Sequence, residues 1–519
     1  MQIKVQQGNI ASFAADAVVV NLFEGVTSPG GGTGAIDTAM GGAITSLISA
    51  GDLRGKSGEF VLVHTMGKLP APRLIICGLG KSEGFDVDKV RGLSADMARY
   101  LRRNRIKHAA IIATGAGIAG LDPEACAAAI AEGTLLGLYR FLRHKKAEED
   151  GDLETLTIVE HDAAKVAALE SGVARGVIMA EAANYCRDLA NEPANYLTPT
   201  AMGNEAEKVA AENGLQVEVY GPDWMREKRM GGILGVAAGS VQEARFIVLR
   251  YNGAGASTEP STGPSTELRT GDAKLLALVG KGITFDTGGI SIKSAENMGE
   301  MKGDMSGGAA VIAAMGAIAK LRPRINVIGI VPATENMPSG SATRPGDVLE
   351  TMLGKTIEVI NTDAEGRLIL ADGLAYAREQ GATAIVDIAT LTGAISVTLG
   401  NVAMGAMSND AALTERVKRA ATAAGEKVWE LPMWDEYKDL IKSDVADMKN
   451  SGGRMAGSIT AAMLLKEFVG DTPWVHLDIA GVDFYNAEKG VIVKGASGIP
   501  VRTLVNLALQ SAEAGASPK

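Results

Sequence analysis

Short runs of aliphatic and β-branched residues alternate along this chain with longer stretches that have the periodicity of helices. In the first part, they predict strands at 17–21, 60–64, 73–78, 109–115 and 156–160, with helices near 86–103 and 123–143. In the second part, they predict strands at 246–251, 274–279, 326–331, 357–360, 384–388 and 474–478. Strands that alternate with helices form sheets covered by helices, so the sequence predicts an α/β fold.

The length of the chain indicates more than one domain. At 519 residues it exceeds the size at which a single hydrophobic core stops growing. The charged stretch 144–152 is typical of a solvated connection, and a long Ala-rich helix is expected over 163–189. We therefore predict a smaller N-terminal α/β domain, 1–165, and a larger C-terminal domain, 166–519, with a mixed sheet covered by helices. The Gly-, Ser-, Thr- and Pro-rich segment 252–272 is expected to be a mobile surface loop.

Composition and charge disfavour several classes of protein. The chain has 51 Lys and Arg against 61 Asp and Glu, a net charge of −10, which disfavours nonspecific binding to nucleic acid or anionic membranes. Its three cysteines form no CxxC motif, so neither a disulfide framework nor a thiolate zinc site is indicated. The N-terminus lacks a signal-peptide pattern, and no apolar run approaches the ~18 residues of a membrane span. These features predict a cytoplasmic protein without a membrane partner.

Two local patterns allow competing interpretations. Four basic residues lie close together and either close a helix, where cations complement the negative end of its dipole, or contact DNA; they are Arg102, Arg103, Arg105 and Lys107. The triplet Asp286-Thr287-Gly288 follows an apolar strand, as in half of an aspartic-protease site, but the sequence holds no second DTG or DSG, so that site would need a dyad formed between two copies of the chain. The G-x-S-x-G and H-E-x-x-H motifs are absent.

Charged residues are concentrated at glycine-rich junctions in the second part of the chain. They comprise four acids, two lysines and one arginine: Asp286, Asp304, Asp363, Glu365, Lys281, Lys293 and Arg367. Carboxylates without histidine or thiolate partners select hard or borderline dications such as Mg²⁺, Mn²⁺ or Zn²⁺. The two-residue spacing of Asp363, Glu365 and Arg367 would direct their side chains to one side of an extended backbone. The inventory therefore suits a two-metal hydrolase.

Structural interpretations of the same residues stand beside this one. Thr362-x-x-Glu365 has the spacing of a capping box, Asp304 could cap the helix that follows it, and Asp286 could begin a turn. Gly366 weakens the capping-box interpretation, because a helix former is preferred there unless the backbone must take an unusual conformation or approach something closely. None of these explanations accounts for so many charged groups at such junctions.

Five sequence motifs together resemble the leucyl (cytosol) aminopeptidase family of dimetal exopeptidases. They are NTDAEGRL at 361–368, VGKGITFDTGGISIK at 279–293, MKGDM at 301–305, NEPANYLTP at 191–199 and DIATLTGA at 387–394. The resemblance covers most of 180–505 and is very specific. It also implies that the N-terminal domain has a macro-like α/β fold.

The resemblance implies a role for each charged residue. Asp286 and Glu365 would bridge two divalent metals, Mn²⁺ or Zn²⁺ with Mg²⁺ possible, while Lys281 and Asp304 complete one site and Asp363 completes the other. Lys281 can ligate only as the neutral amine, so the metals must lower its pKa. Lys293 would assist as an electrophile. Arg367 would hold a bicarbonate ion that transfers the proton, because a guanidinium is too basic to act as the base.

The resemblance also implies the substrate and the assembly. The first side chain of a peptide would lie against Met301, Thr390, Gly393 and Ala480, with the carbonyl of Leu391 accepting from its α-amine. Such a wall would suit Leu and similar apolar residues, although Asp483 stands near a position expected to be apolar. The expected protein is a homohexameric exopeptidase in intracellular peptide turnover. Because some relatives bind DNA, the alternative is a DNA-binding accessory protein with secondary peptidase activity.

Overall fold

The computed structural model describes residues 1–116, 120–146, 151–254 and 274–514. The chain divides into two compact units, one made of Met1–Glu181 with Asn486–Lys494 and the other of Ala182–Tyr485 with Gly495–Lys519. The division between the two units falls inside the long helix α5, Ala163–Asn191. The domain boundary predicted from the sequence lies at the beginning of this helix. The boundary at 165 stays a prediction. The predicted loop 252–272 lies mostly outside the described residues.

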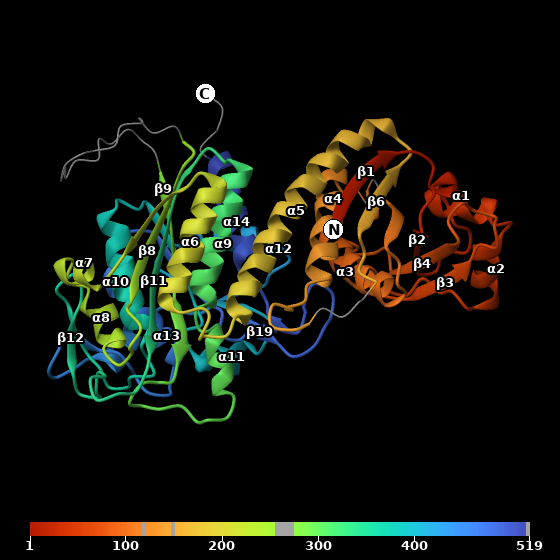
Figure 1. Cartoon of the computed structure of the whole chain (residues 1–519). Coiled ribbons are helices and arrows are strands. Elements are labelled where there is room, and N and C mark those ends of the chain that lie inside the picture. The colour runs from red at the N-terminus through yellow and green to blue at the C-terminus, as the bar shows by residue number, and fades with distance from the viewer. Residues whose placement is uncertain (117–119, 147–150, 255–273, 515–519) are drawn as a thin grey trace. The chain divides into compact units, whose positions relative to one another are not determined.

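The first unit contains, in its described part, a six-stranded sheet with helices on both faces (Figure 1). Its strands lie in the order β1, Gln2–Gln7; β6, Thr155–Glu160; β5, His108–Ile112; β2, Ala17–Phe23; β4, Arg73–Gly80; and β3, Phe60–His64. Only β3 runs antiparallel to its neighbour within this set. The helices are α1, Gly31–Ala39; α2, Ala43–Ala50; α3, Val87–Arg103; α4, Pro123–Gly137; and the first part of α5, with the short η1 at Ile10–Ser12.

Strand β2 shows why this sheet is covered on both faces. Val19 packs into the core that holds Leu93 of α3, whereas Val18 and Val20 pack into the core that holds Ile36 of α1. A strand buried on both sides needs a continuous apolar run, which the AVVV segment provides. The basic cluster lies at the end of α3, with Arg102 and Arg103 in its last turn, as the helix-closing interpretation predicts.

The second unit contains a nine-stranded sheet, counted over the residues that the structure describes. Its main path is β16, Val428–Glu430; β15, Met404–Ser408; β18, Trp474–Asp478; β14, Ala384–Ala389; β9, Leu275–Gly280; β11, Asn326–Asn336; β8, Arg245–Asn252; and β7, Gln216–Tyr220. β10, Gly282–Asp286, continues from β9 and pairs with the second half of β11. Parallel and antiparallel pairs both occur, so the predicted mixed sheet is confirmed.

Helices cover both faces of this second sheet (Figure 1). One layer holds α6, Pro199–Asn213; α9, Ser306–Leu321; α12, Ala411–Ala424; and α14, Val501–Ala514. The other holds α8, Gly231–Ala237; α10, Gly366–Glu379; and α13, Gly457–Val469. The remaining helical segments are α7, Pro222–Glu227; α11, Gly393–Leu399; η2, Met298–Gly303; and η3, Asp435–Ile441. The small sheets are β12, Val348–Glu350, with β13, Thr356–Glu358, and β17, Met448–Lys449; and β19, Phe484–Tyr485, with β20, Gly495–Ala496.

One helical stretch, 298–321, is long and apolar enough to cross a membrane by length and composition alone. Most of its apolar window is buried inside the protein, as in a core helix. The strands predicted from aliphatic runs are all present, with ends shifted by up to five residues, the largest shift being at the end of β11. The helix predicted at 123–143 is shorter and ends at Gly137.

Candidate active site

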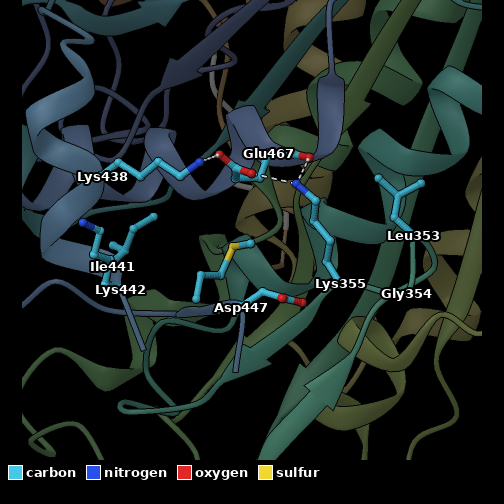
Figure 2. A pocket seen from close by; sticks show the side chains of 9 residues that line it. Leu353, Gly354, Lys355, Lys438, Ile441, Lys442, Asp447 and Glu467 are labelled. Atoms are coloured by element: carbon cyan, nitrogen blue, oxygen red, sulfur yellow. Dashed lines mark hydrogen bonds and ion pairs between the residues drawn. The ribbon is translucent and has the colours of Figure 1, made fainter. Parts of the chain in front are cut away.

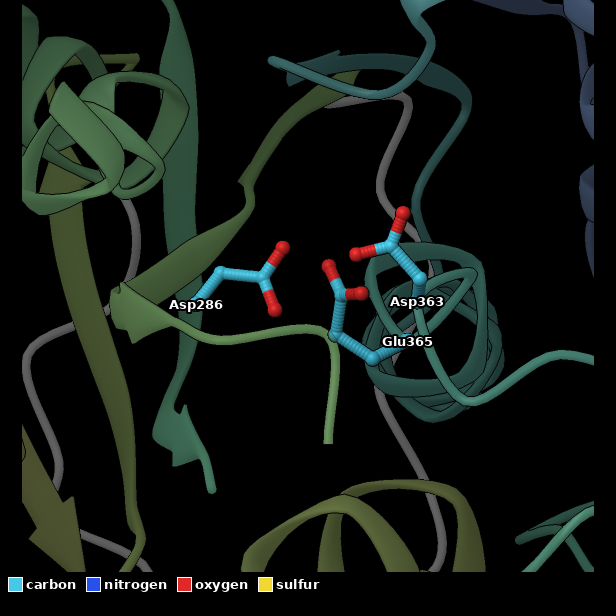
Figure 3. Close-up of side chains that lie close together, drawn as sticks. All are labelled: Asp286, Asp363 and Glu365. Atoms are coloured by element: carbon cyan, nitrogen blue, oxygen red, sulfur yellow. The ribbon is translucent and has the colours of Figure 1, made fainter. Parts of the chain in front are cut away.

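Carboxylates from distant parts of the sequence meet at one edge of the second sheet. Asp286 is the last residue of β10, and Asp363 and Glu365 lie between β13 and the first turn of α10. Each of these three offers an oxygen within 4.8 Å of those of the other two. Figure 3 shows the three carboxyl groups pointing toward one another. The arrangement is of the kind that holds a cation.

Lys281 joins a fourth carboxylate to this group. Its Nζ lies 2.8 Å from Oδ1 of Asp304 and 2.9 Å from Oε1 of Glu365, and it donates to the carbonyl of Thr390 at 2.9 Å. The Lys281 side chain is only 3% exposed. It lies in the short link between β9 and β10, so the central strands of the sheet fix its position.

Lys293 binds the opposite side of the cluster. Its Nζ lies 2.8 Å from Oδ2 of Asp286 and 2.5 Å from Oδ1 of Asp363. Its side chain is 26% exposed and therefore remains accessible to solvent, in contrast to Lys281. The structure thus brings together all five predicted metal ligands and Lys293.

Gly366 is explained by its contact with Lys281. A Cβ at this position would lie 2.8 Å from Cδ and Cε of Lys281 and 2.9 Å from its Nζ. These distances are shorter than any ordinary contact, so the start of α10 can approach the lysine only without a side chain. Of the two reasons that the sequence left open for Gly366, the structure therefore shows the close approach.

The capping-box interpretation of this segment is wrong. Glu365 is the N-cap of α10, and its side chain makes no capping hydrogen bond. Thr362 instead donates to the carbonyl of Gly288 at 2.6 Å and accepts from the amide of Ser291 at 2.8 Å. The expectation of an extended backbone is also wrong, because Glu365 has helical dihedral angles. A turn followed by a helix start, rather than strand alternation, orients these side chains.

Asp304 ends η2 and does not cap α9, whose N-cap is Met305. Its Oδ1 accepts from Thr390 Oγ1 at 2.8 Å and faces Lys281. Its Oδ2 is buried and has no hydrogen-bond partner in the described part of the chain. Buried polar atoms are normally satisfied, so this oxygen is available to a metal ion. The donor set fits divalent cations.

Sequence reasoning missed Asn336, which ends β11 and is in register with Asp286. Its Nδ2 donates to Oδ1 of Asp286 at 2.8 Å and to the carbonyl of Thr362 at 3.0 Å, and it lies 3.4 Å from Oε2 of Glu365. The only local signal was a polar residue at the end of an apolar strand. Its importance depends on pairing between β10 and β11.

The ionisation of the cluster is dominated by burial and by mutual charge. Burial alone would lower the pKa of Lys281, but Asp304, Glu365 and Asp286 reverse this and raise it. Burial raises the pKa of Asp304 and of Glu365, although Lys281 opposes the shift in both. In the metal-free protein Lys281 is therefore a protonated counterion. The lowered pKa inferred from the resemblance applies only when metals are bound.

Arg367 is buried in the first turn of α10, and its Nη1 donates to the carbonyl of Asn450 at 2.8 Å. Its Nε has no hydrogen-bond partner among the described residues. Burial lowers the pKa of Arg367 to about 10, against the opposing effect of Glu365. A buried guanidinium with an unused N–H group is suited to hold a small anion.

The residues predicted to contact substrate lie in three nearby connections. Thr390 and Leu391 follow β14, Gly393 begins α11, Ala480 follows β18, and Met301 lies in η2. Of these, Thr390 contacts the cluster directly, through Asp304 and Lys281. The structure places Asp483 beside η2, because its Oδ2 would be 3.8 Å from a Cβ built on Gly303. Burial raises the pKa of Asp483 to about 7.

A cavity of about 290 Å³ lies away from these residues. It is lined by Leu353, Gly354, Lys355, Lys438, Ile441, Lys442, Asp447, Met448 and Glu467. Figure 2 shows Lys355 and Lys438 reaching Glu467 from two sides, at 2.6 and 2.5 Å. None of the predicted site residues lines it, so it is not the candidate active site.

Comparison with known proteins identifies the family. The profile of the cytosol aminopeptidase family, catalytic domain, matches residues 184–505, and that of the N-terminal domain of this family matches 19–148. A probable cytosol aminopeptidase of Solibacter usitatus (strain Ellin6076) is 46% identical over 513 residues, covering 98% of this chain and 99% of the relative. That of Alkaliphilus metalliredigens (strain QYMF) is 44% identical over 512 residues, with coverage of 98% and 99%.

Solved structures agree with this assignment. A mutant of tomato leucine aminopeptidase is 33% identical with a TM-score of 0.85, covering 98% of this chain and 96% of that chain. The bottromycin maturation enzyme BotP in complex with Mn is 30% identical with a TM-score of 0.82, covering 96% and 100%. This chain therefore belongs to the cytosol aminopeptidase family and is a hydrolase of the leucyl aminopeptidase type.

Proposed function

We propose that this protein is a two-metal exopeptidase that removes unblocked N-terminal residues, Leu and similar apolar residues preferred, from peptides in the cytoplasm. The observation that carries the proposal is the convergence of four carboxylates on two lysines, with Oδ2 of Asp304 buried and unpartnered among the described residues. Excess buried negative charge of this kind is stable only when cations compensate it.

The metal ligands in this proposal are Lys281, Asp286, Asp304, Asp363 and Glu365. The resemblance to the family implies that Asp286 and Glu365 would be shared by both ions, and their oxygens lie within 4.8 Å of one another and of an oxygen of Asp363. Mn²⁺ or Zn²⁺ suits these donors, with Mg²⁺ as a further option, and one solved relative is named as a complex with Mn. When bound, a pair of such ions lowers the pKa of water and polarises the scissile carbonyl.

Lys293 is proposed to stabilise the developing negative charge on the carbonyl oxygen. Its ammonium is held by Asp286 and Asp363 at the accessible side of the cluster, and these two acids raise its pKa against the opposing effect of burial. It therefore stays charged at neutral pH. A fixed cation aimed at the place where charge develops lowers the barrier without further reorganisation.

Arg367 is proposed to hold bicarbonate. Even with its pKa lowered by burial it remains protonated near pH 7, so it cannot accept the proton of the attacking water. Arg367 would hold this anion at its unused N–H group, and bicarbonate bound there would supply the proton-transfer chemistry that the guanidinium lacks.

Substrate is proposed to bind with its free α-amine on the metal that Lys281 and Asp304 would hold, and this amine would donate to the carbonyl of Leu391. Its first side chain would lie against Met301, Thr390, Gly393 and Ala480. A blocked α-amine could not bind the metal that Lys281 and Asp304 would hold, which restricts cleavage to free N-termini. We further propose a homohexamer, and the net charge of −10 disfavours a nucleic-acid partner.

The decisive experiment compares metal content and turnover in the same preparations. Wild-type protein should hydrolyse leucine p-nitroanilide but not its N-acetyl derivative, lose activity on chelation and regain it with Mn²⁺. Asp286→Ala and Asp363→Ala should lose metal and turnover together. Glu467→Ala is the matched control, because that acid is also held by two lysines but lies in the other cavity. Full activity in both site variants would refute the proposal.

A further inference from the structure

Asp478 is a buried carboxylate to which the proposed mechanism assigns no role. It is the last residue of β18 and is fully buried. Its hydrogen bonds among the described residues go to backbone amides and to one hydroxyl. Burial raises the pKa of Asp478, although the nearby His476 and the hydrogen bonds that Asp478 accepts oppose this shift. Burying a carboxylate costs folding free energy, so we expect the contacts of Asp478 to have a function.

The contacts of Asp478 all go to segments that carry the proposed substrate residues. Its Oδ1 accepts from the amides of Leu391 at 3.1 Å, Thr392 at 3.4 Å and Ala480 at 3.3 Å. Its Oδ2 accepts from Thr392 Oγ1 at 2.6 Å. One side chain thus connects the turn after β14 with the turn after β18.

These two turns lie at the ends of neighbouring parallel strands, because Ala389 of β14 pairs with Asp478 of β18. The first turn is already tied to the acidic cluster, since Lys281 donates to the carbonyl of Thr390 at 2.9 Å. It is also tied to α11, because Thr392 caps that helix through the amide of Ile395 at 3.2 Å. Asp478 joins the turn after β18 to this frame.

We propose that Asp478 is a positioning residue for substrate. It holds the Leu391 carbonyl and Ala480, two proposed substrate contacts, at a fixed distance from each other. The proposal rests on the proposed function, because that function assigns these two residues to the substrate. Asp478 does not touch the reacting atoms. It acts through the amides that it binds.

Asp478→Ala should lower kcat/KM for leucine p-nitroanilide about 100-fold, since a misplacement of about 1 Å in a substrate contact has this effect. Most of the loss should be in KM, because the contacts hold bound substrate rather than the transition state alone. The Mn²⁺ content per subunit should equal that of wild type, because Asp478 contacts none of the proposed metal ligands.

Asp478→Asn should recover most of the loss. Its Oδ1 can accept the same three amides, and its Nδ2 can donate to Thr392 Oγ1, whose proton then turns to Ser458 Oγ at 2.7 Å. The matched control is Asp372→Ala. Asp372 is also fully buried and accepts from the amides of Ile233 and Met352, but it contacts no proposed substrate residue.

A merely structural role for Asp478 would reduce the folded fraction, and thus apparent kcat, without changing KM. The inference is overturned if the Asp478→Ala and Asp372→Ala variants both melt earlier yet keep the wild-type KM. Should Asp478→Ala not fold, Thr392→Val keeps the Asp478 carboxylate but removes its 2.6 Å bond, together with the hydroxyl's contacts to the Ile395 amide and to Ser458, and should still raise KM. An unchanged KM in that variant also overturns the inference. An inactive wild-type enzyme would instead overturn the proposed function itself.

Discussion

Replacing Gly366 with alanine tests the geometry of the site most directly. The added Cβ would lie 2.8 Å from Cδ and Cε of Lys281, whereas carbon atoms in contact are normally about 3.5–4.0 Å apart. Either the buried lysine or the start of α10 must therefore move by about 1 Å. Overpacking of this size costs about 1–3 kcal/mol. The better helix propensity of alanine returns about 1 kcal/mol, so the net change in unfolding free energy should be a loss of about 0–2 kcal/mol.

The effect on function should be larger than the effect on stability. Lys281 Nζ now lies 2.8–2.9 Å from Asp304 and Glu365, and a displacement of about 1 Å should lower kcat/KM about 100-fold. The assay combines leucine p-nitroanilide kinetics, Mn²⁺ titration by calorimetry and thermal unfolding. The control is Gly92→Ala in α3, where an added Cβ would meet nothing within 4 Å and should be stabilising. A Gly366→Ala variant that gains stability like the control, with normal Mn²⁺ affinity and turnover, would refute the reasoning.

Three further predictions concern the same cluster. Asp304 and its neighbours raise the pKa of Lys281 in the metal-free protein, so metal binding must release the proton of Lys281 and the apparent Mn²⁺ affinity should rise with pH. Calorimetry in buffers of different ionisation enthalpy should detect the released proton. A binding enthalpy that does not depend on the buffer would contradict this prediction. Asn336→Leu should weaken Mn²⁺ binding about 10–100-fold, because it removes the side-chain donor that orients Asp286. An unchanged Mn²⁺ affinity would contradict this role of Asn336. Lys293→Met should lower kcat while Mn²⁺ content is retained, and equal loss of both would show that the lysine mainly holds the ligands together.

Much of the fold could be predicted because hydrophobic periodicity is a local property. The AVVV run of β2 and the Ala-rich pattern of α5 are visible without knowledge of their neighbours. Polar edge strands gave no such signal: β1, QIKVQQ, is largely exposed and was not predicted. The order of strands in each sheet likewise depends on which faces pack together, and short-range patterns do not carry that information.

For the site, the sequence by itself determined the chemistry. The glycine-rich motifs supplied the acids, the lysines and Gly366 at the ends of predicted strands, and these residue types select divalent cations. Only the tertiary structure decided how they meet. Lys281 reaches Asp304 and Glu365 because β9 and β10 bring it to the start of α10, and Asn336 and Asp478 acquire their partners only through strand pairing. Identity is a property of each residue, whereas distance between residues far apart in the chain is set by the packing of the whole sheet.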